Sequence, residues 1–423
     1  MKFIAYIAFL LSGINPQPAT RNPQLSISNP QPASITLPAG FKSSTIIESL
    51  GTNRHIWVNN NGDIFVKLEK LKDGKGIIVL RDVKKDGVYS VVQSFCNYTG
   101  TGIVVKNGYL YATSDFAVYR YKLNAGGLVE NPDKPETIVK DLVSLNQHAS
   151  KSIALDDAGN LYVTIGAPSN ACQVKDRTAG SPGQDPCPIL EKAGGVWQFK
   201  ANVKGQSYNN GVRYITGIRN VVGVFWNKQQ GQLYGVQHGR DQLAGLFPKL
   251  YTNEQSAELP AEEFFLMKKG SDFGWPYCYY DQMQKKKVLG PEYGGDGTTQ
   301  GLCADKDQPI MAFPGHWAPN DLLFYTGDQF PAKYKNGAFI AFHGSWNRGP
   351  LPQQGYNVVF VPFKNGKPSG PYEVFASGFT GKDVIMGPGQ SAYRPCGLAQ
   401  GPDGSLYVSD DRVGKIWKIT YSK

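Results

Sequence analysis

A short motif recurs six times in this chain and constrains its fold more than any other feature. Each copy consists of a turn glycine, one further residue and then the apolar or aromatic start of a strand. The copies are GDIFV at Gly62, GYLYA at Gly108, GNLYV at Gly159, GQLYG at Gly231, GAFIA at Gly337 and GSLYV at Gly404. Asn-Gly and Asp-Gly turns supply the positive φ of a tight hairpin, and the aromatic and β-branched residues that follow suit a half-buried pleated surface. We therefore expect one β-hairpin at each copy.

The spacing of the copies predicts a six-bladed β-propeller, an all-β fold with long inter-strand insertions. The first two steps, from Gly62 to Gly108 and on to Gly159, match the length of propeller blades, and the later steps are enlarged by insertions. The largest insertion is expected at Tyr251 to Pro309, in or beside the fourth blade. Composition agrees, because 49 Gly and 28 Pro without a sustained helical period favour short strands joined by turns. Chance matches to so short a motif are the alternative, but the last copy lies in a complete hairpin context, GPDGSLYVSDDRVGKIWKITY.

The N-terminus resembles a signal peptide followed by a linker. One lysine precedes an apolar run from Phe3 to Leu11, which falls short of the roughly 20 residues that span a bilayer. A tract rich in Pro, Asn and Gln follows from Pro16 to Pro32. We expect residues 1–32 to be a signal-like segment and linker, residues 33–423 to form the propeller domain, and the protein to be periplasmic or secreted without a stable membrane span. A buried N-terminal strand is the alternative for the apolar run.

The cysteines fit an exported protein. Cys172 and Cys187 bracket one Gly- and Pro-rich loop, and Cys278 and Cys303 bracket a second, so these local pairs are the preferred disulfides among the possible connectivities. No C-x-x-C spacing exists, which disfavours a zinc or iron–sulfur site. The formal net charge is +10, but the basic residues are scattered along the chain. The sequence therefore does not predict a nucleic-acid partner.

Polar residues gather at both ends of the hairpin from Gly217 to Leu243. Arg219 and Asn220 precede its first strand, and His238, Gly239 and Arg240 follow its second. In a propeller the inter-strand loops of every blade converge on the central channel. We expect these two groups to lie in one pocket.

Other blades offer polar groups at corresponding places beside the motif. They are Arg54 in the first blade, His148 before the third copy, the segment His343 to Arg348 after the fifth, and Arg394 before the sixth. His148, His238 and His343 are expected to face the channel, whereas His55 and His316 receive no assignment. A pocket with several arginines, an asparagine and a neutral histidine suits a planar polyanion, because guanidinium groups bind carboxylates bidentately. The histidine is then free to act as a base near neutral pH. Structural roles for single arginines and histidines remain the alternative.

Five stretches together resemble the glucose/sorbosone dehydrogenase family, the soluble six-bladed propellers that use pyrroloquinoline quinone (PQQ). The stretches are GIRN, QHGRDQL, LPAEEFFLMKKGSDFGWPYCYYD, FHGSWNRGP and YRPCGLAQGPDGSLYVSDD. The resemblance covers most of the chain from about Arg54 to Tyr421 and is closest to the sorbosone dehydrogenase and fungal pyranose dehydrogenase branch.

The resemblance implies roles for individual residues. His148 corresponds to the catalytic general base, which removes the proton of the sugar C1 hydroxyl while hydride passes to the quinone. Arg219, also assigned as catalytic, and Asn220 correspond to the pair that contacts the quinone oxygens. Gly239 and Arg240 correspond to the residues whose backbone carbonyls bind Ca²⁺, with His238 beside them. Because Ca²⁺ accepts backbone oxygens, no carboxylate cluster is required.

Further cofactor contacts are implied in the first, fifth and sixth blades. Arg54, Arg394 and either His343 or Arg348 correspond to residues that bind the cofactor carboxylates. The sequence departs from the bacterial glucose dehydrogenases, since Ala392 stands where those enzymes have an additional arginine. This departure favours the sorbosone or pyranose branch and argues against glucose as the substrate.

The resemblance therefore implies a PQQ- and Ca²⁺-dependent dehydrogenase that oxidises an aldose or related sugar at the anomeric carbon and passes electrons to a soluble acceptor such as a cytochrome. Two other functions remain open. One is a Ca²⁺-dependent propeller hydrolase resembling a lactonase, although such sites hold the metal with Asp, Glu and Asn side chains. The other is an extracellular propeller that binds a ligand without catalysis, because fold alone does not define function.

Overall fold

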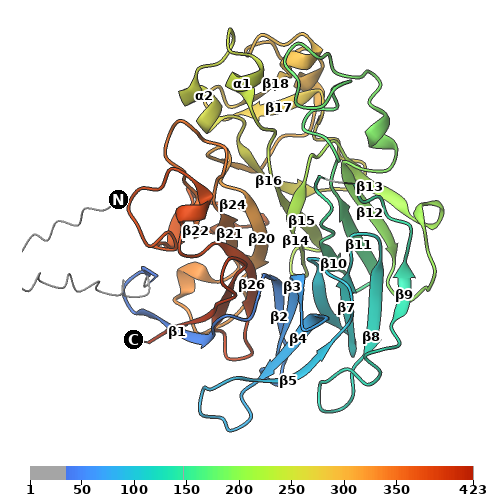
Figure 1. Ribbon diagram of the computed structural model, residues 1–423, viewed down its shortest axis with the longest axis vertical. Coiled ribbons are helices and arrows are strands. Elements are labelled where there is room, and N and C mark those ends of the chain that lie inside the picture. The colour runs from blue at the N-terminus through green and yellow to red at the C-terminus, as the bar shows by residue number, and fades with distance from the viewer. Residues whose placement is uncertain (1–34, 146, 423) are drawn as a thin grey trace, which may run out of the picture. The chain divides into compact units, whose positions relative to one another are not determined.

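The computed structural model describes residues 35–145 and 147–422. This part of the chain contains six four-stranded antiparallel sheets. Figure 1 shows the sheets following one another in chain order around a common centre. Blade 1 contains β2 (Asn53–Val58), β3 (Ile64–Lys72), β4 (Lys75–Arg81) and β5 (Ser90–Phe95); blade 2 contains β6 (Ile103–Lys106), β7 (Tyr109–Thr113), β8 (Val118–Lys122) and β9 (Glu136–Val139); blade 3 contains β10 (Ile153–Leu155), β11 (Asn160–Ile165), β12 (Gly195–Lys200) and β13 (Val212–Thr216). Blade 4 contains β14 (Val221–Asn227), β15 (Gln232–Gln237), β16 (Glu262–Met267) and β19 (Met311–Phe313); blade 5 contains β20 (Pro319–Phe324), β21 (Ala338–His343), β22 (Tyr356–Val361) and β25 (Glu373–Ala376); blade 6 contains β26 (Pro395–Gln400), β27 (Leu406–Asp410), β28 (Ile416–Tyr421) and β1 (Phe41–Ile47).

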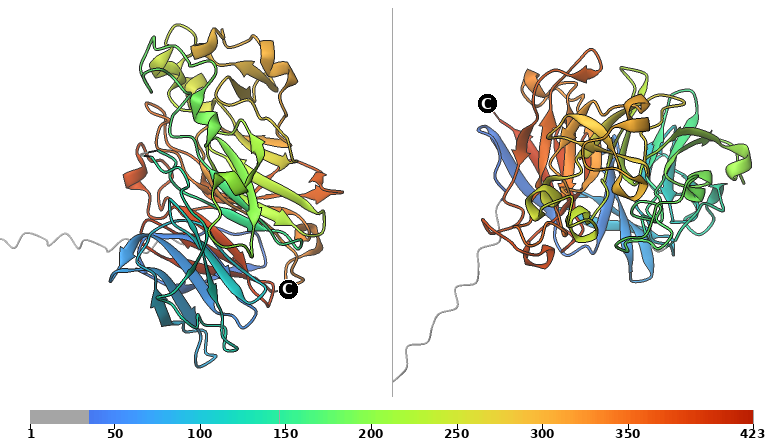
Figure 2. Two further views of the ribbon diagram at one scale, coloured as in Figure 1. Left: turned by 90° about the vertical axis from the view of Figure 1, so that its right-hand side faces the viewer. Right: turned by 90° about the horizontal axis from the view of Figure 1, so that it is seen from above.

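The first strand of each blade lies against the first strands of both neighbouring blades. In sequence order, β2 contacts β6, β6 contacts β10, β10 contacts β14, β14 contacts β20 and β20 contacts β26. The last of these strands, β26, contacts β2. Blade 6 is completed by β1, which pairs antiparallel with β28 from the other end of the domain. These contacts close the ring, and the predicted six-bladed propeller is confirmed. Figure 2 shows the same sheets from two further directions.

Each copy of the recurring motif leads into the second strand of one blade. These strands are β3, β7, β11, β15, β21 and β27. The expected positive φ occurs at the motif glycines of five copies, with Gly62 at 87° and Gly404 at 81°. In the fifth copy Asn336, at 63°, adopts the left-handed conformation in place of Gly337. Asparagine tolerates this conformation better than most residues, so the turn is preserved.

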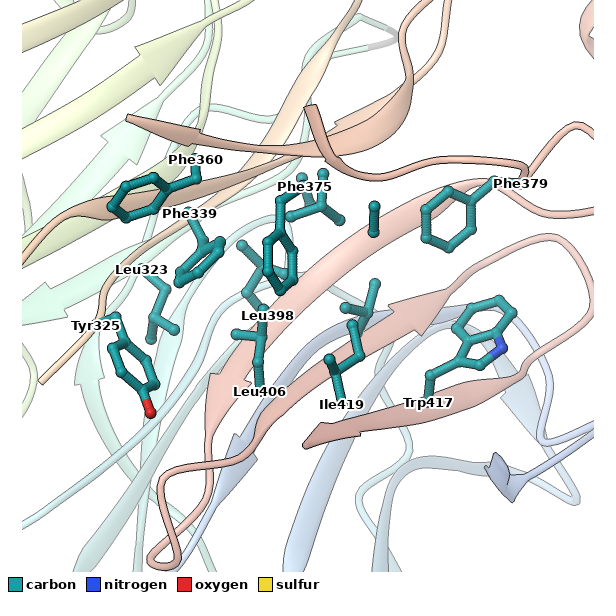
Figure 3. Close-up of a cluster of buried hydrophobic side chains, with 14 of the residues drawn as sticks. Leu323, Tyr325, Phe339, Phe360, Phe375, Phe379, Leu398, Leu406, Trp417 and Ile419 are labelled. Carbon is teal, nitrogen blue, oxygen red and sulfur yellow. The ribbon is translucent and has the colours of Figure 1, made fainter. Parts of the chain in front are cut away.

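Apolar side chains fill the spaces between neighbouring blades. Figure 3 shows the cluster between blades 5 and 6, where Phe339, Phe360 and Phe375 face Leu398 and Ile419. All five are at most 4% exposed. Alternating residues of the short strands thus build a continuous core between sheets, as expected for a propeller.

Two insertions enlarge blade 4. Between β15 and β16 lie the short helices α1 (Leu243–Leu246) and α2 (Asn253–Glu258), and between β16 and β19 lies a hairpin of β17 (Cys278–Asp281) and β18 (Lys286–Leu289). The insertion expected at residues 251–309 therefore also contains β16, the third strand of the blade. The hairpin β23 (Phe363–Lys364) and β24 (Lys367–Pro368) extends blade 5. Single 3-10 turns are found at Pro188–Glu191, Tyr208–Asn210, Pro291–Tyr293, Gly301–Asp305, Ala332–Tyr334 and Pro388–Gln390.

Both preferred disulfides are present, Cys172–Cys187 and Cys278–Cys303, while Cys96 and Cys396 are buried free thiols. Trp275 packs against the first disulfide and donates its indole N–H to the carbonyl of Asn170 at 3.0 Å. The predicted signal-like segment and linker, residues 1–32, lie outside the described residues. In the described part of the chain, no helix has the length and apolar character needed to cross a membrane.

Candidate active site

A polar cavity of about 280 Å³ lies at one end of the central channel. Apart from Glu262 at the start of β16, its walls come from loops that join second to third strands, or the fourth strand of one blade to the first strand of the next. Because neighbouring strands are antiparallel, all these loops leave the propeller at the same end. The lining residues are Gln147, His148, Arg177, Arg219, His238, Gly239, Asp241, Glu262, His316, Ala318, Trp346 and Asn347.

His148 is held as a neutral imidazole with a defined tautomer. Its Nδ1 lies 2.5 Å from the carbonyl oxygen of Ala167. Because a carbonyl only accepts hydrogen bonds, Nδ1 carries the proton and Nε2 keeps a free lone pair. Burial and then the positive charge of Arg219 lower the pKa of His148 to about 3. The side chain is therefore a proton acceptor at neutral pH, and an anion placed beside it would raise its basicity.

Arg219 and Asn220 lie next to His148, as expected. Arg219 donates to the carbonyl of Gly239 at 2.6 Å and to the carboxylate of Asp241 at 2.7 Å. Within the described residues, the Nε of Arg219 and the Oδ1 of Asn220 are buried without a hydrogen-bond partner. Buried polar atoms without partners are rare in folded proteins and require an explanation, such as a bound ligand.

Asp241, to which no role was assigned from the sequence, connects the groups on this side of the cavity. Its carboxylate accepts from Arg219 at 2.7 Å, from Arg177 at 2.9 Å and from Asn347 at 2.5 Å. The side chain of Asn170 accepts a hydrogen bond of 2.8 Å from the backbone N–H of Asp241 and donates one of 3.0 Å to its backbone carbonyl. Asp241 directly follows Arg240 in the cluster His-Gly-Arg-Asp, so its position in the motif was the available signal.

A second charged cluster joins blades 1, 5 and 6. Asp411 accepts from Arg54 at 3.0 Å and lies 2.7 Å from Nε2 of His343. Burial would raise the pKa of Asp411, but His343 and Arg54 hold it well below its ordinary value. Arg394 donates to the carbonyl of Gly344 at 2.6 Å. The structure thus brings together three of the predicted cofactor residues around a carboxylate that the sequence analysis did not identify.

His238 stands between the two clusters. Its Nε2 donates to the carbonyl of Pro319 at 3.1 Å, which leaves Nδ1 unprotonated in the neutral ring. Burial, Arg219 on one side, and His343 and Arg54 on the other lower the pKa of His238 to about 3. His238 therefore lies close enough to both clusters to be affected by the charges of each.

Two of the predicted site residues direct their guanidinium groups away from the cavity. Arg240 forms an ion pair with Glu292 in the blade 4 insertion. Arg348 donates to Glu258, at the end of α2, at 2.6 Å and to the carbonyl of Pro352 at 3.2 Å. Of the two alternatives left open for the fifth blade, His343 lies with Arg54 and Arg394, whereas Arg348 supports the insertion.

Several further cavity residues were missed. His316 lacked an assignment, but it lines the cavity 3.7 Å from Asp241; burial would lower its pKa, and this carboxylate raises it. Burial raises the pKa of Glu262 to about 7, although Gly239 and Ala318 donate backbone N–H groups to it. Trp346 and Asn347 occupy the segment that was considered only for His343 and Arg348. Trp346 is 54% exposed at the rim.

His55 lies elsewhere, in an apolar cavity of about 220 Å³ lined by the first strands of several blades. Its Nε2 donates to the carbonyl of Asn320 at 2.7 Å. The channel thus has a more apolar section in addition to its polar end.

The oxygen atoms at the polar end could hold a hard cation. The carbonyl of Gly239 and the carboxylates of Asp241 and Glu262 belong to cavity-lining residues. Across the described residues, no group of three or more His, Cys, Asp or Glu side chains is arranged to hold a metal ion. A metal at this end would therefore need backbone, water or ligand oxygens to complete its coordination.

The fold and the site define a class of protein: a six-bladed propeller with a polar cavity at the end of its channel, lined by arginines and a neutral histidine. The chain belongs to the TrAA12-like family, whose model matches residues 35–422. This membership confirms the family resemblance found in the sequence.

The chain is also similar to individual proteins in sequence and in structure. The chain is 27% identical over 279 residues to a pyrroloquinoline quinone-dependent pyranose dehydrogenase of Coprinopsis cinerea, an alignment that covers 57% of this chain and 36% of that protein. The chain spans about half or less of the length of the curated relatives it matches. In structure it resembles the calcium structure of a Trichoderma reesei family AA12 protein, with a TM-score of 0.73, 21% identity and coverage of 92% of this chain and 98% of the other. It also resembles the holo form of the PQQ domain of the Coprinopsis cinerea enzyme, with a TM-score of 0.71, 20% identity and coverage of 92% and 97%. At these identities the structural likenesses establish the fold.

Proposed function

We propose that this protein is a PQQ- and Ca²⁺-dependent dehydrogenase that oxidises a sugar of the pyranose or sorbosone type at C1. The observation that carries the proposal is the convergence of a neutral His148 with partnerless polar atoms of Arg219 and Asn220. A Cβ placed on Gly166 would lie 2.6 Å from the Cβ of His148 and 2.9 Å from the Oδ1 of Asn220, so these two side chains adjoin one another. A base and hydrogen-bonding groups for an oxygen-rich ligand therefore meet at one point.

The residues present fit the two cofactors named for the similar proteins. Arg219, Asn220 and His238 would hold the quinone end of PQQ, and Arg54, His343 and Arg394 would bind its carboxylates. The arginines suit this task because guanidinium groups pair with planar carboxylates. The carbonyls of Gly239 and Arg240 are the proposed Ca²⁺ ligands. Arg219 donates to the carbonyl of Gly239 in this structure, so metal binding would require that guanidinium to turn toward the ligand.

When bound, PQQ supplies the acceptor for the hydride of the sugar C1 carbon, and Ca²⁺ polarises that acceptor. The contribution of the chain is to move a proton and to offset charge. Nε2 of His148 accepts the proton of the C1 hydroxyl, and the bond from Nδ1 to Ala167 keeps the ring in the required tautomer. The guanidinium of Arg219 balances the negative charge that develops on the ligand oxygens.

Two observations support the finer parts of the proposal. The disulfides fit a secreted or periplasmic protein, because such bonds persist in oxidising compartments. The polar end of the channel is bordered by Trp346, an exposed aromatic side chain that suits a sugar face. A soluble electron acceptor such as a cytochrome would then reoxidise the cofactor.

The test is a titration of the metal-free protein with PQQ and Ca²⁺, followed by addition of sorbosone, glucose, fucose and glucosone in turn. We expect tight binding, seen in the quinone absorbance, and bleaching by at least one sugar. The variant His148→Asn should bind PQQ within about threefold of the wild type and lose roughly 100-fold or more of its sugar-dependent dye reduction. Asparagine can still donate to Ala167, so the loss would report the missing base.

Lack of PQQ binding would overturn the proposal. A Ca²⁺-dependent hydrolysis of lactones or esters by the same protein would support the propeller hydrolase instead. Binding of PQQ without oxidation of any sugar would favour a propeller that only binds its ligand.

A further inference from the structure

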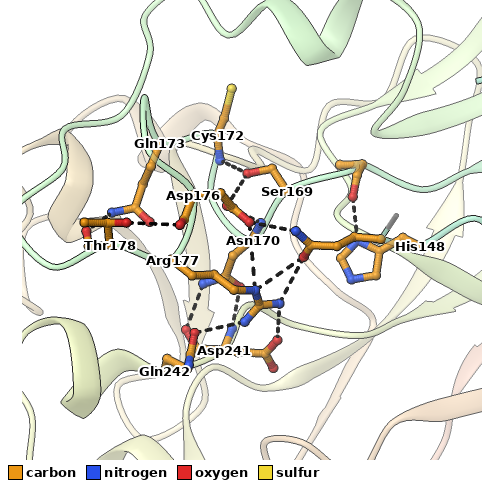
Figure 4. Close-up of polar contacts among 12 residues, drawn as sticks. His148, Ser169, Asn170, Cys172, Gln173, Asp176, Arg177, Thr178, Asp241 and Gln242 are labelled. Carbon is orange, nitrogen blue, oxygen red and sulfur yellow. Dashed lines mark hydrogen bonds and ion pairs between the residues drawn. The ribbon is translucent and has the colours of Figure 1, made fainter. Parts of the chain in front are cut away.

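The loop between β11 and the 3-10 turn at Pro188–Glu191 is closed by the Cys172–Cys187 disulfide and reaches the cavity wall. Its stem packs with Trp275, and the carbonyl of Ala171 accepts a hydrogen bond from Tyr293 at 3.1 Å. A disulfide across 15 residues limits the conformations open to such a loop. Two charged residues of the loop, Asp176 and Arg177, point toward the segment that carries His148 (Figure 4).

Asp176 and Arg177 both form hydrogen bonds with the side chain of Gln147, the residue before His148. Asp176 accepts from the side-chain amide of Gln147 at 2.7 Å, while Arg177 donates to the amide oxygen of Gln147 at 3.2 and 3.3 Å. Both polar ends of the glutamine side chain are thus bound by neighbouring residues of one loop.

The same loop is fixed to Asp241. Arg177 donates to the Asp241 carboxylate at 2.9 Å and to the side-chain oxygen of Gln242 at 3.0 Å. Asp176 in turn accepts from the hydroxyl of Ser169 at 2.7 Å and from the backbone N–H of Asn170 at 2.9 Å. Burial would raise the pKa of Asp176, but the bonds from Ser169 and Gln147 lower it, so the carboxylate stays ionised at neutral pH.

His148 needs such support because its backbone is in an unfavourable conformation. Its φ is 52°, in the left-handed region that costs a residue with a side chain roughly 1 kcal/mol or more. Residues persist in this conformation only where their surroundings hold them there. The contacts to Gln147 restrain the chain directly before this strained residue.

We propose that Asp176 and Arg177 form a clamp that positions His148 and links it to the Asp241–Arg219 pair. The inference that the clamp serves catalysis rests on the proposed function, in which His148 is the general base. The clamp itself is a structural statement and can be tested without cofactor or substrate. Asp176 and Arg177 are positioning residues, since they act through Gln147 and Asp241.

The first experiment measures the imidazole directly, by ¹⁵N NMR of protein labelled at its five histidines. His148→Asn assigns the His148 signal. In the wild type we expect the tautomer protonated at Nδ1. In Asp176→Ala we expect the His148 signal to shift toward a mixture of tautomers, because the ring loses its fixed relation to Ala167. Lys175→Ala, an exposed neighbour on the same loop, is the matched control and should leave the signal unchanged.

The second experiment separates positioning from binding in the loaded enzyme. Asp176→Ala should lower kcat about tenfold or more, since small displacements of a catalytic group are costly, while KM and the affinity for PQQ stay within about threefold. Lys175→Ala should behave like the wild type in all three measurements.

A double-mutant cycle tests the Gln147 contact specifically. Asp176→Asn turns a donor toward the amide of Gln147, and Gln147→Glu places two carboxylates together, so both single variants should lose activity. The double variant restores a donor and an acceptor with the positions exchanged, and it should recover at least about tenfold over Gln147→Glu.

These outcomes separate the clamp from the proposed function. An unchanged His148 signal in Asp176→Ala would overturn the clamp, even if the protein oxidises sugars. A shifted signal in a protein that never oxidises a sugar would retain the clamp and reject the proposed function. Equal activity of the double variant and Gln147→Glu would also contradict the positioning role.

Discussion

Gly166 shows how closely single residues fix the site. It directly follows β11 and precedes Ala167, whose carbonyl accepts a hydrogen bond from Nδ1 of His148. A Cβ at this position would lie 2.6 Å from the Cβ of His148 and 2.7 Å from its carbonyl oxygen. Atoms at such distances overlap, so only glycine allows the histidine to approach the backbone.

We therefore predict that Gly166→Ala lowers kcat/KM by about tenfold or more, because the added methyl group displaces His148 and Asn220. Steady-state kinetics with whichever sugar bleaches the quinone in the proposed titration would measure this effect. Gly245→Ala is the control, since a Cβ there meets no atom within 4 Å. Equal losses in the two variants would show that the close contact at Gly166 has no special importance.

His148 also makes the stability of the fold depend on pH. Its pKa is about 3 in the folded protein and lies near its ordinary value of 6.5 in the unfolded chain. Between these values the unfolded chain binds a proton that the folded protein does not, so the free energy of unfolding falls as the pH decreases from 7.

The expected contribution of His148 is a loss of about 2 kcal/mol between pH 7 and pH 5. Urea unfolding of the wild type and of His148→Asn at both pH values would measure it. The variant should lose about 2 kcal/mol less than the wild type over this interval, because asparagine does not titrate. Parallel pH dependence of the two proteins would contradict the prediction.

Site residues with a fixed position relative to the repeated motif could be predicted from the sequence, whereas residues defined by their contacts with distant parts of the chain could not. His148, Arg219 and His238 stand at fixed places relative to the motif, so the repeat predicted that they face the channel. Asp241 and Asp411 became recognisable only through their partners. Asp411 pairs with Arg54 from the opposite end of the domain, and such a contact depends on closure of the ring rather than on any local pattern.

At the scale of single elements, a buried ion pair fastens the hairpin β17–β18 to blade 4. Lys287 in β18 is 0% exposed and donates to Glu263 in β16 at 3.0 Å. Gln237 in β15 donates to the other oxygen of the same carboxylate at 2.7 Å. Removing one partner of a buried pair leaves an uncompensated charge, whereas removing both avoids this cost.

We predict that Lys287→Met destabilises the protein by about 3 kcal/mol, since Glu263 keeps its burial and loses its cation. The double variant Glu263→Gln with Lys287→Met should be more stable than Lys287→Met alone. Denaturant unfolding of both variants and the wild type would test this order. If the double variant were the less stable, the pair would act by packing rather than by charge.

The sequence predicted the strands that follow a motif glycine, and it did not predict β16, which no motif glycine precedes. The six second strands all follow the motif and were located from it. β16, with the sequence EEFFLM, lacks a preceding motif glycine and was included in the expected insertion. Its pairing with β15 is visible only in the sheet, because two short helices separate the strands in sequence.

At the scale of the whole molecule, β1 closes the ring. Phe41 at its start packs edge-to-face against Phe330 and Phe375, with ring centroids 4.8 Å and 4.9 Å apart. It also packs against the tilted ring of Tyr421 in β28, at 4.9 Å between centroids. The strand thus joins blade 6 to blade 5 as well as to its own sheet. The repeat predicted the number of blades, but it could not predict this closure, since FKSSTII contains no copy of the motif.

Because β1 closes the ring, a destabilising substitution in β1 should lower the stability of all six blades. Phe41→Ala removes the aromatic contacts and should lower the free energy of unfolding by about 2–3 kcal/mol, because a partly buried ring is lost. Every blade is held between two neighbours, so hydrogen exchange should accelerate for the slowest amides of distant blade 3 as well as for blade 6. Phe116→Ala, at a side chain that is 59% exposed, is the control and should change stability by less than about 0.5 kcal/mol. Acceleration confined to blade 6, with blade 3 unchanged, would mean that the last blade opens independently and that the ring does not unfold as one unit.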